Sequence, residues 1–165
     1  MPATDHLRLL LFAVGGRHLA IPTSCVEAVV AAVAIVPLPK APPIVEGVIN
    51  VRGTLVPVLD VRRRFDLPPL ALGLDQHFVI ARAGPRLVAL RVDRALDVTT
   101  VDQRAVEAAA GVVPQVEYVA GIAKLPDGLL VIHDLERFLS LEEGTGVDAA
   151  VTEAAPRRGG SRKTP

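Results

Sequence analysis

A hairpin pattern at residues 47–61 constrains the fold of this chain more than any other part of its sequence. The segment reads GVINVRGTLVPVLDV, in which two short apolar runs flank Arg52-Gly53. Glycine readily adopts the positive φ angle that a tight two-residue turn requires. The flanking runs are rich in β-branched residues, which favours strands that are buried on both faces. The pattern therefore predicts a buried hairpin whose tip exposes Asn50 and Arg52.

The same pattern returns once, at residues 121–135, which read GIAKLPDGLLVIHDL. An offset of 74 residues (121 − 47) aligns the two segments without a gap, so that Gly47 meets Gly121 and Asp60 meets Asp134. A weaker pair, residues 12–20 and 80–88, has an offset of about 69. Two such passes predict two similar subdomains, and a chance likeness between two apolar hairpins is the alternative interpretation.

The remaining sequence predicts an all-β fold made of small barrels. Short strand-like runs alternate with glycine turns, and short strands must curl to close their edges. Hydrophobic residues make up 50% of the 165 positions, enough for a sizeable core. Short helices are expected at about 25–29, 62–65, 103–110 and 135–141, and residues 28–36 are either the end of the first helix or a strand. Residues expected in a core shared by both halves are Leu55, Val56, Val58, Leu59, Leu129, Val131 and Ile132.

The domain boundaries follow from where this periodicity starts and stops. We expect a disordered N-terminus at 1–6, one domain at 7–143 and a disordered tail at 144–165, because the tail is rich in Gly, Pro and charge. Residues 1–6 do not read as a signal peptide, and the longest apolar run, 28–39, is shorter than the ~20 residues of a membrane helix. The expectation is a soluble cytosolic chain.

Composition argues against several classes of function. Eighteen basic and eighteen acidic residues cancel, whereas nucleic-acid binding usually shows as a basic excess. The single cysteine, Cys25, excludes an internal disulfide and a cysteine zinc site. The four histidines lie in no metal-binding or nucleophile motif. The sequence thus predicts no catalytic residue, no metal and no cofactor, and the charge run Arg62–Arg64 is expected to form a solvated face.

Residues 47–67 resemble the signature of CheW-type chemotaxis coupling domains, whose pattern runs roughly G-x-x-N-L-R-G-x-x-x-P-V-x-D-L-R. The matching positions are Gly47, Asn50, Arg52, Gly53, Pro57, Val58, Asp60 and Arg62. Val51 and Val61 stand where leucine is usual. The resemblance extends from about Leu9 to Leu141 and includes the VDRALDV segment at 92–98.

This resemblance implies a fold of two five-stranded, SH3-like β-barrels that pack on a shared apolar core. It also implies a non-catalytic adaptor that bridges two partners: the cytoplasmic tip of a chemoreceptor and the regulatory domain of a CheA-type histidine kinase. Such an adaptor is cytoplasmic and is recruited to membrane-associated receptor arrays. It binds no nucleic acid and does not insert into the membrane.

The resemblance also assigns binding residues. Receptor contact is expected at the motif arginine, Arg52, and in a groove whose matching positions are Val26, Val29 and Val48. Kinase contact is expected on a barrel edge, at Ile35, Val36, Pro37 and Leu38.

Three alternatives remain beside this interpretation. The first keeps the CheW-like scaffold but places it in a chemosensory pathway that does not control motility. The second is a small-barrel nucleic-acid binder, which needs a basic face with stacking aromatics; the chain has one Tyr and four Phe. The third is an enzyme, for which the sequence offers no constellation. The sequence leaves open which receptor and kinase are bound and what the output is.

Overall fold

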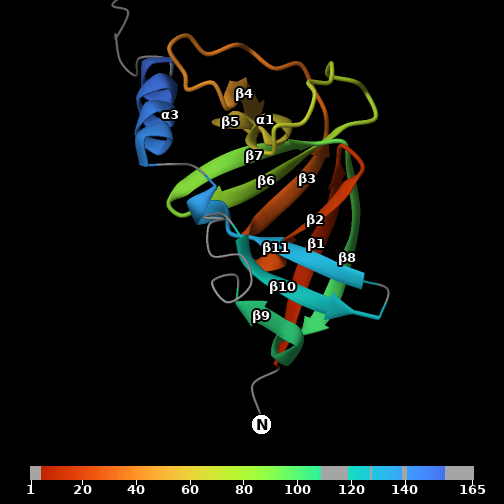
Figure 1. Cartoon of the computed structure of the whole chain (residues 1–165). Coiled ribbons are helices and arrows are strands. Elements are labelled where there is room, and N and C mark those ends of the chain that lie inside the picture. Colours follow the sequence, from red (N-terminus) through yellow and green to blue (C-terminus); the bar gives the residue numbers. More distant parts are fainter. Residues whose placement is uncertain (1–4, 109–118, 127, 139–140, 155–165) are drawn as a thin grey trace, which may run out of the picture.

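The computed structural model describes residues 5–108, 119–126, 128–138 and 141–154 (Figure 1). Within these residues the strands form two curved sheets, one of five strands in the order β3-β6-β7-β5-β4 and one of six in the order β8-β1-β2-β11-β10-β9. In Figure 1 the five-stranded sheet lies in the upper half and the six-stranded sheet in the lower half. The all-β, two-barrel prediction is confirmed.

The strands in chain order are β1 (His6–Val14), β2 (Arg17–Pro22), β3 (Val26–Ala31), β4 (Val45–Val51), β5 (Thr54–Asp60), β6 (His77–Ala83), β7 (Arg86–Val92), β8 (Arg94–Asp102), β9 (Val106–Ala108), β10 (Val119–Leu125) and β11 (Gly128–His133). Two α-helices occur in the described part of the chain, α1 (Val61–Arg64) and α3 (Leu141–Ala154). The six-stranded sheet has one strand more than expected for a barrel, because a 3₁₀ turn at Gln103–Ala105 separates β8 from β9 within the same sheet.

The predicted glycine turns are present. β1 and β2 join at Gly15-Gly16, where both φ angles are positive, 58° and 77°. β4 and β5 join at Arg52-Gly53, with φ of 51° and 85°. Positive φ at both central residues is the geometry that lets a two-residue turn follow the right-handed twist of its strands.

Three predicted helices are wrong. Residues 26–29 belong to strand β3, along which half-buried and exposed residues alternate, after a 3₁₀ turn at Thr23–Cys25. Only one turn forms at Gln103–Ala105, and Val106–Ala108 then pairs with β10. A further 3₁₀ turn replaces the helix expected from Leu135. Strand pairing outweighs helix propensity here, since propensity is a weak prior. Residues 109–110 and 139–140 of the predicted helices lie outside the described part.

The internal repeat is present in the strand register. Val58 of β5 lies beside Ala89 of β7 in a parallel pair, and Ile132 of β11 lies beside Ala20 of β2 in another. These pairs give offsets of 74 (132 − 58) and 69 (89 − 20). The likeness of the two segments therefore reflects two barrels of the same construction.

The largest buried cluster is shared by the two sheets. It contains Phe12 of β1, Ile21 of β2, Leu59 of β5 and Leu90 of β7, and it also takes in Val147 of α3. Two smaller clusters fill the separate barrels, one around Phe78 and Val56 and one around Leu9 and Leu130. The prediction of a core common to both halves is thus confirmed.

The predicted burial is wrong at one position. Leu129 is 71% exposed, because it points away from the barrel whose interior its neighbours Leu130 and Ile132 fill. Leu55 and Val131 are half-buried, whereas Val56, Val58 and Leu59 are fully buried as expected.

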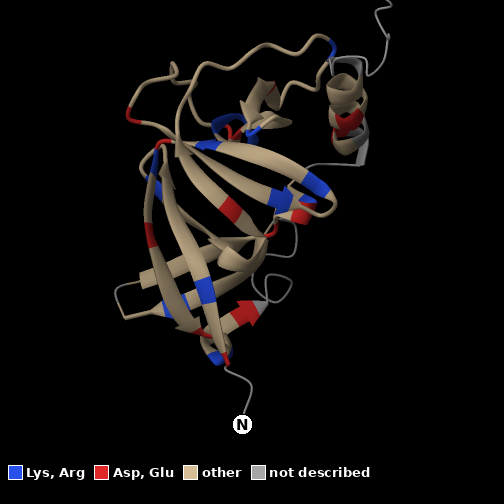
Figure 2. Ribbon diagram, turned by 180° about the vertical axis from the view of Figure 1, so that it is seen from behind, with Lys and Arg blue, Asp and Glu red and all other residues tan. Residues whose placement is uncertain are grey.

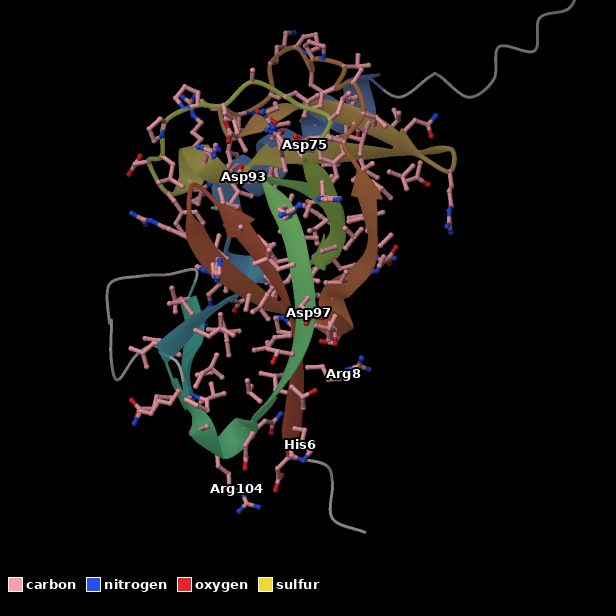
Figure 3. All side chains as sticks on the ribbon, turned by 90° about the vertical axis from the view of Figure 1, so that its right-hand side faces the viewer. His6, Arg8, Asp75, Asp93, Asp97 and Arg104 are labelled. Carbon is pink, nitrogen blue, oxygen red and sulfur yellow. The ribbon has the colours of Figure 1, made fainter. Side chains whose placement is uncertain are left out.

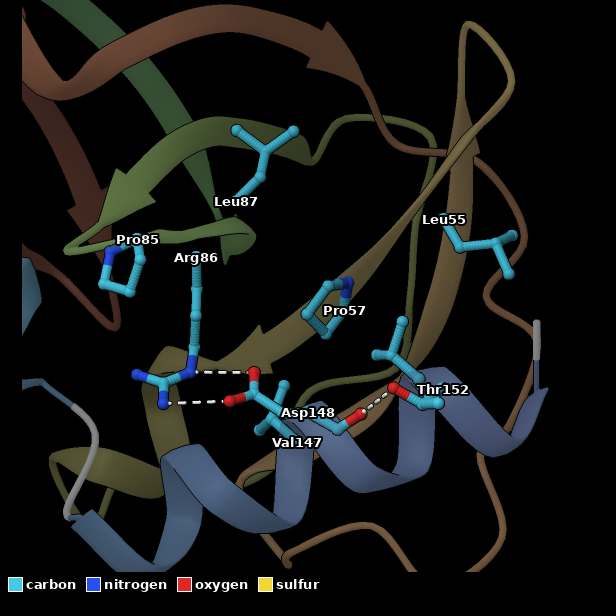
Figure 4. Close-up of a pocket in the computed structure, with 9 residues that line it drawn as sticks. Leu55, Pro57, Pro85, Arg86, Leu87, Val147, Asp148 and Thr152 are labelled. Carbon is cyan, nitrogen blue, oxygen red and sulfur yellow. Dashed lines mark hydrogen bonds and ion pairs between the residues drawn. The ribbon is translucent and has the colours of Figure 1, made fainter.

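The C-terminal segment also differs from the prediction. Residues 141–154 form helix α3, so the disordered tail expected from residue 144 is wrong for 144–154; residues 155–165 lie outside the described part. Val147 and Ala150 are buried, and Asp148 pairs with Arg86 of β7 (Figure 4). The two buried positions are three residues apart in the sequence, so they share one face of the helix. At the other end, β1 begins at His6, inside the segment 1–6 that was expected to be disordered.

Candidate functional site

The β4–β5 hairpin presents Arg52 at its tip. The Arg52 side chain is exposed, and its backbone has a φ of 51°, a left-handed conformation that is uncommon for a residue other than glycine. Asn50 stabilises the turn, since its Oδ1 accepts a hydrogen bond of 2.7 Å from the backbone N–H of Gly53. Asn50, Arg52 and Gly53 therefore form one unit, in which two residues hold the turn and the third is displayed.

Gly47 lets the segment before β4 approach the strand. Val36 forms an isolated bridge with Val48 through two backbone hydrogen bonds, 3.0 Å from Val36 N to Val48 O and 2.8 Å from Val48 N to Val36 O. A Cβ at Gly47 would lie 2.2 Å from Val36 O, closer than any side chain permits. The motif glycine is therefore required by the close approach of the backbone.

Beside this bridge lies an apolar depression of ≈ 290 Å³. Its lining residues are Val36, Pro37, Leu38, Pro39, Val48, Ile49, Asn50 and Leu55. The structure thus brings three of the predicted kinase contacts next to Val48, a predicted receptor contact. Val36 is 62% exposed, whereas Val48 is only 6% exposed and offers little surface.

The other predicted receptor contacts lie on β3. Val26 is half-buried and packs against the shared core, and Val29 is 40% exposed. Because β3 and β4 are the two edge strands of the five-stranded sheet, strand pairing does not bring Val26 and Val29 to Val48. Ile35, the remaining predicted kinase contact, is half-buried against the interior of this barrel.

Two motif residues have structural roles. The Asp60 carboxylate caps α1, accepting a hydrogen bond of 3.2 Å from the backbone N–H of Arg63. Pro57 is buried on β5 opposite Val48. Asp134, the equivalent of Asp60 in the repeat, forms the same kind of cap, since its carboxylate accepts a hydrogen bond of 3.0 Å from the backbone N–H of Glu136.

The charge run on α1 is not the solvated face that was expected. Arg62 binds Asp93 with an Nη2–Oδ2 distance of 2.6 Å, and Arg64 binds Glu143 at 2.6 Å. Only Arg63 of the three is exposed. Figure 3 shows Asp93 where β8 begins, at the end of that strand which lies near the five-stranded sheet. Asp93 lies in the VDRALDV segment, but no short-range signal connects it with Arg62.

A second polar cluster was also missed by the sequence analysis. Arg91 of β7 donates to the carboxylate of Glu46 and to the carbonyl of Leu70, and its Nε donates to Gln76 Oε1 at 2.8 Å. The Gln76 amide then donates to the carbonyl of Ala71 at 3.1 Å. These bonds attach the loop between α1 and β6 to the barrel.

Two titratable groups are perturbed by their surroundings. Burial raises the pKa of the Glu46 carboxyl, and the nearby Arg91 acts in the opposite direction. Burial likewise raises the pKa of the Cys25 thiol, whose Sγ donates to the carbonyl of Pro22 at 3.0 Å. A raised thiol pKa lowers the thiolate fraction, which is the opposite of what a nucleophilic cysteine requires.

Three further observations concern metal binding, membrane spans and the distribution of charge. Within the described residues no group of three or more His, Cys, Asp or Glu side chains is placed to hold a metal ion. None of the helices in the described part of the chain is long and apolar enough to cross a membrane. On the face in Figure 2, basic and acidic residues are interspersed along the strands and do not form a basic stripe.

Comparison with known proteins gives one consistent result. A protein-family profile described as "CheW-like domain" matches residues 8–143. The chain is 27% identical over 141 residues to "Chemotaxis protein CheW" of Klebsiella aerogenes, covering 84% of this chain and 85% of the relative. It is 31% identical over 137 residues to the protein of that name from Bacillus subtilis, covering 82% and 88%.

A solved structure agrees with these relatives. The crystal structure of the scaffolding protein TtCheW from Thermoanaerobacter tengcongensis has a TM-score of 0.75 and 26% sequence identity to this chain. The match covers 83% of this chain and 94% of that one.

Proposed function

We propose that this chain, which belongs to the CheW-like domain family, is a non-catalytic adaptor. It couples the cytoplasmic tip of a chemoreceptor to the regulatory domain of a CheA-type histidine kinase. Family members of this kind act as scaffolds in chemotaxis, so the proposal assigns the chain a binding role in the cytoplasm at receptor arrays. The alternative is that the same adaptor works in a chemosensory pathway that controls an output other than motility.

Arg52 is the observation that carries the receptor half of the proposal. A non-glycine residue with a φ of 51° at an exposed turn costs stability, and such strain persists where function depends on the side chain. Glycine or asparagine would satisfy the turn at lower cost. Arginine is also among the residues favoured at the energetic centres of interfaces. We therefore assign Arg52 to receptor contact. Val26, Val29 and Val48 are the other receptor contacts that we propose from the family resemblance, although strand pairing does not bring Val26 and Val29 to Val48.

The kinase half rests on the apolar depression beside the β4 edge. Val36, Pro37 and Leu38 line it, and Val36 is largely exposed although it is apolar. An exposed apolar strip next to a strand edge is suited to pack against another β-domain. We therefore assign Ile35–Leu38 to the kinase.

The test measures two affinities on two variants. Purified chain is titrated with a receptor cytoplasmic fragment and, separately, with the kinase regulatory domain. Arg52→Glu should weaken receptor binding at least thirtyfold, about 2 kcal/mol, and leave kinase binding within twofold. Val36→Glu should do the reverse. Arg94→Glu, the same charge change at an exposed position on β8, is the matched control and should alter neither affinity.

Three results would contradict the proposal. Failure of the unmodified chain to bind either partner would remove the coupling function. Equal losses for both partners in Arg52→Glu would place the two contacts on one surface. An unchanged receptor affinity in Arg52→Glu would return this arginine to an ordinary surface residue.

A further inference from the structure

Helix α3 covers a defined patch of the barrel formed by β3–β7. The patch consists of Leu55 and Pro57 on β5 and Arg86 on β7, which line one side of a hollow whose other side is formed by Val147 and Val151 of the helix (Figure 4). Arg86 binds Asp148 through two contacts, Nε to Oδ1 at 2.9 Å and Nη2 to Oδ2 at 3.0 Å. This docking combines small apolar side chains with one guanidinium–carboxylate pair.

The internal repeat gives this patch an equivalent on the other barrel. The strand register fixes the correspondence, with an offset of 74 residues from β5 to β11 and of 69 from β7 to β2 (132 − 58 and 89 − 20). The equivalent positions are Leu129 for Leu55, Val131 for Pro57 and Arg17 for Arg86. We call Leu129, Val131 and Arg17 the repeat patch.

The repeat patch continues onto β10. Val131 lies opposite Ile122, and Leu129 lies opposite Lys124, in the antiparallel β10–β11 pair. Residues directly opposite each other in such a pair project from the same face. Ile122 and Val131 are half-buried, so the face presents an apolar strip that ends at the exposed Leu129.

Two basic side chains, Arg17 and Lys124, lie at the repeat patch. Arg17 is exposed and forms no ion pair with any residue that the structure describes. Lys124 is exposed and is paired with Glu107 of β9 at 2.6 Å. On the first barrel the corresponding arginine, Arg86, is paired with Asp148, whereas no carboxylate among the described residues is paired with Arg17.

We propose that the repeat patch is a docking site for a short helix of a partner protein, with the chemistry that α3 shows on the first barrel. Such a helix carries small apolar side chains at spacings of three and four residues, as Val147, Ala150 and Val151 do, and a carboxylate beside them for Arg17. This site is on the second barrel, so it goes beyond the receptor and kinase contacts assigned above, which involve β3 and β4.

The occupant is argued from two observations. A helix already lies beside the equivalent surface of the same chain, attached to it by the Arg86–Asp148 ion pair, with Val147 buried in the shared core. An unpaired arginine at the place of Arg86 also calls for an acidic partner residue. The chain's own α3 is excluded as occupant, because it is engaged on the first barrel through Asp148.

A peptide with the α3 sequence is the probe. Residues 141–154 are synthesised with Gly146→Ala, which raises helix propensity and disfavours binding to the first barrel, where a Cβ at this position would lie 2.8 Å from Pro42 Cγ. The full chain, labelled with nitrogen-15, is titrated with this peptide up to several millimolar. We expect saturable amide shifts at Arg17, Leu129 and Val131.

Variants separate specific from general binding. Arg17→Glu and Leu129→Ser should each weaken peptide binding at least tenfold, and both positions are exposed, so neither change should unfold the chain. Arg94→Glu is the matched control and should weaken binding less than twofold. A peptide that also carries Asp148→Lys should not bind.

Four outcomes would overturn the proposal. No saturable shift means that the patch takes no helix, and shifts confined to Leu55 and Arg86 mean that the peptide only exchanges with α3. Concentration-dependent dimerisation that Leu129→Ser abolishes would assign the patch to a second copy of the chain. Shifts at Leu129 on deletion of residues 155–165 alone would assign it to the chain's own C-terminus.

Discussion

Arg62 and Asp93 form a bidentate ion pair where the two sheets meet. Arg62 Nη2 lies 2.6 Å from Asp93 Oδ2, and Arg62 Nε lies 3.2 Å from Asp93 Oδ1. Asp93 Oδ2 also accepts a hydrogen bond of 2.8 Å from the backbone N–H of Gly15. Arg62 follows β5 of one sheet, and Gly15 lies in the β1–β2 turn of the other. Asp93 thus connects the motif segment with the opposite barrel.

We expect Asp93→Ala to destabilise the fold by about 1–3 kcal/mol, because it leaves a half-buried guanidinium and a backbone N–H without their acceptor. Urea denaturation measures this difference. Glu27→Ala is the control, since Glu27 pairs with Arg82 at 2.7 Å on the exposed surface and such pairs contribute about 0–1 kcal/mol. An equal cost for both variants would show that the Asp93 contacts are no stronger than an ordinary surface pair.

Arg52→Asn should raise stability while it weakens receptor binding. Asparagine tolerates positive φ and Asn-Gly is the favoured pair in this turn, so a gain of roughly 0.5–1 kcal/mol is expected. Arg63→Asn, at an exposed arginine with ordinary φ, should change stability by only a few tenths of a kcal/mol. A loss of stability in Arg52→Asn would mean that the arginine side chain stabilises the fold.

Two adjacent leucines on β11 should respond very differently to truncation. Leu130→Ala removes a fully buried side chain and should cost ~2–5 kcal/mol, whereas Leu129→Ala should stay within ~0.5 kcal/mol because that side chain is mostly in solvent. Thermal or urea unfolding of both variants measures the contrast. Similar costs would mean that β11 pairs in a register shifted by one residue.

Helix α3 should contribute to stability, and the residues after it should not. A chain that ends at residue 154 should keep its Tm, whereas one that ends at residue 140 loses the burial of Val147 and Ala150. A loss of ~2 kcal/mol corresponds to roughly 4–8 °C in Tm for a chain of this size. Val147→Asp should reproduce most of this loss, and Ala149→Asp, on the exposed side of α3, should not.

Cys25 should react slowly with thiol reagents. Burial raises the pKa of its thiol, so at pH 8 the thiolate fraction is below that of free cysteine, and the rate should rise only at more alkaline pH. Because the folded pKa is raised, the contribution of this group to stability is full below the unfolded pKa and is lost as pH rises through the folded pKa. A Cys25→Ser variant should lack this alkaline loss, and a rate equal to that of free cysteine would contradict the burial.

The sequence by itself determined the features that depend on neighbouring residues. Positive φ at Arg52-Gly53 follows from the turn between two strands, and the cap at Asp60 follows from a carboxylate placed just before a helix. The repeat of this segment 74 residues later (121 − 47) also determined the two-barrel architecture. Each of these is set by local backbone geometry, which a short stretch of sequence records.

Only the tertiary structure decided the features that depend on distant partners. Val26 and Val29 belong to a strand because β6 pairs with them, and this pairing outweighs the preference that predicted a helix at 25–29. Helix α3 forms where the sequence shows Gly and little periodicity, because the first barrel supplies an apolar surface and Arg86. Leu129 lies outside and Leu130 inside because a strand alternates its faces, and the register that makes this choice is set by β2 and β10.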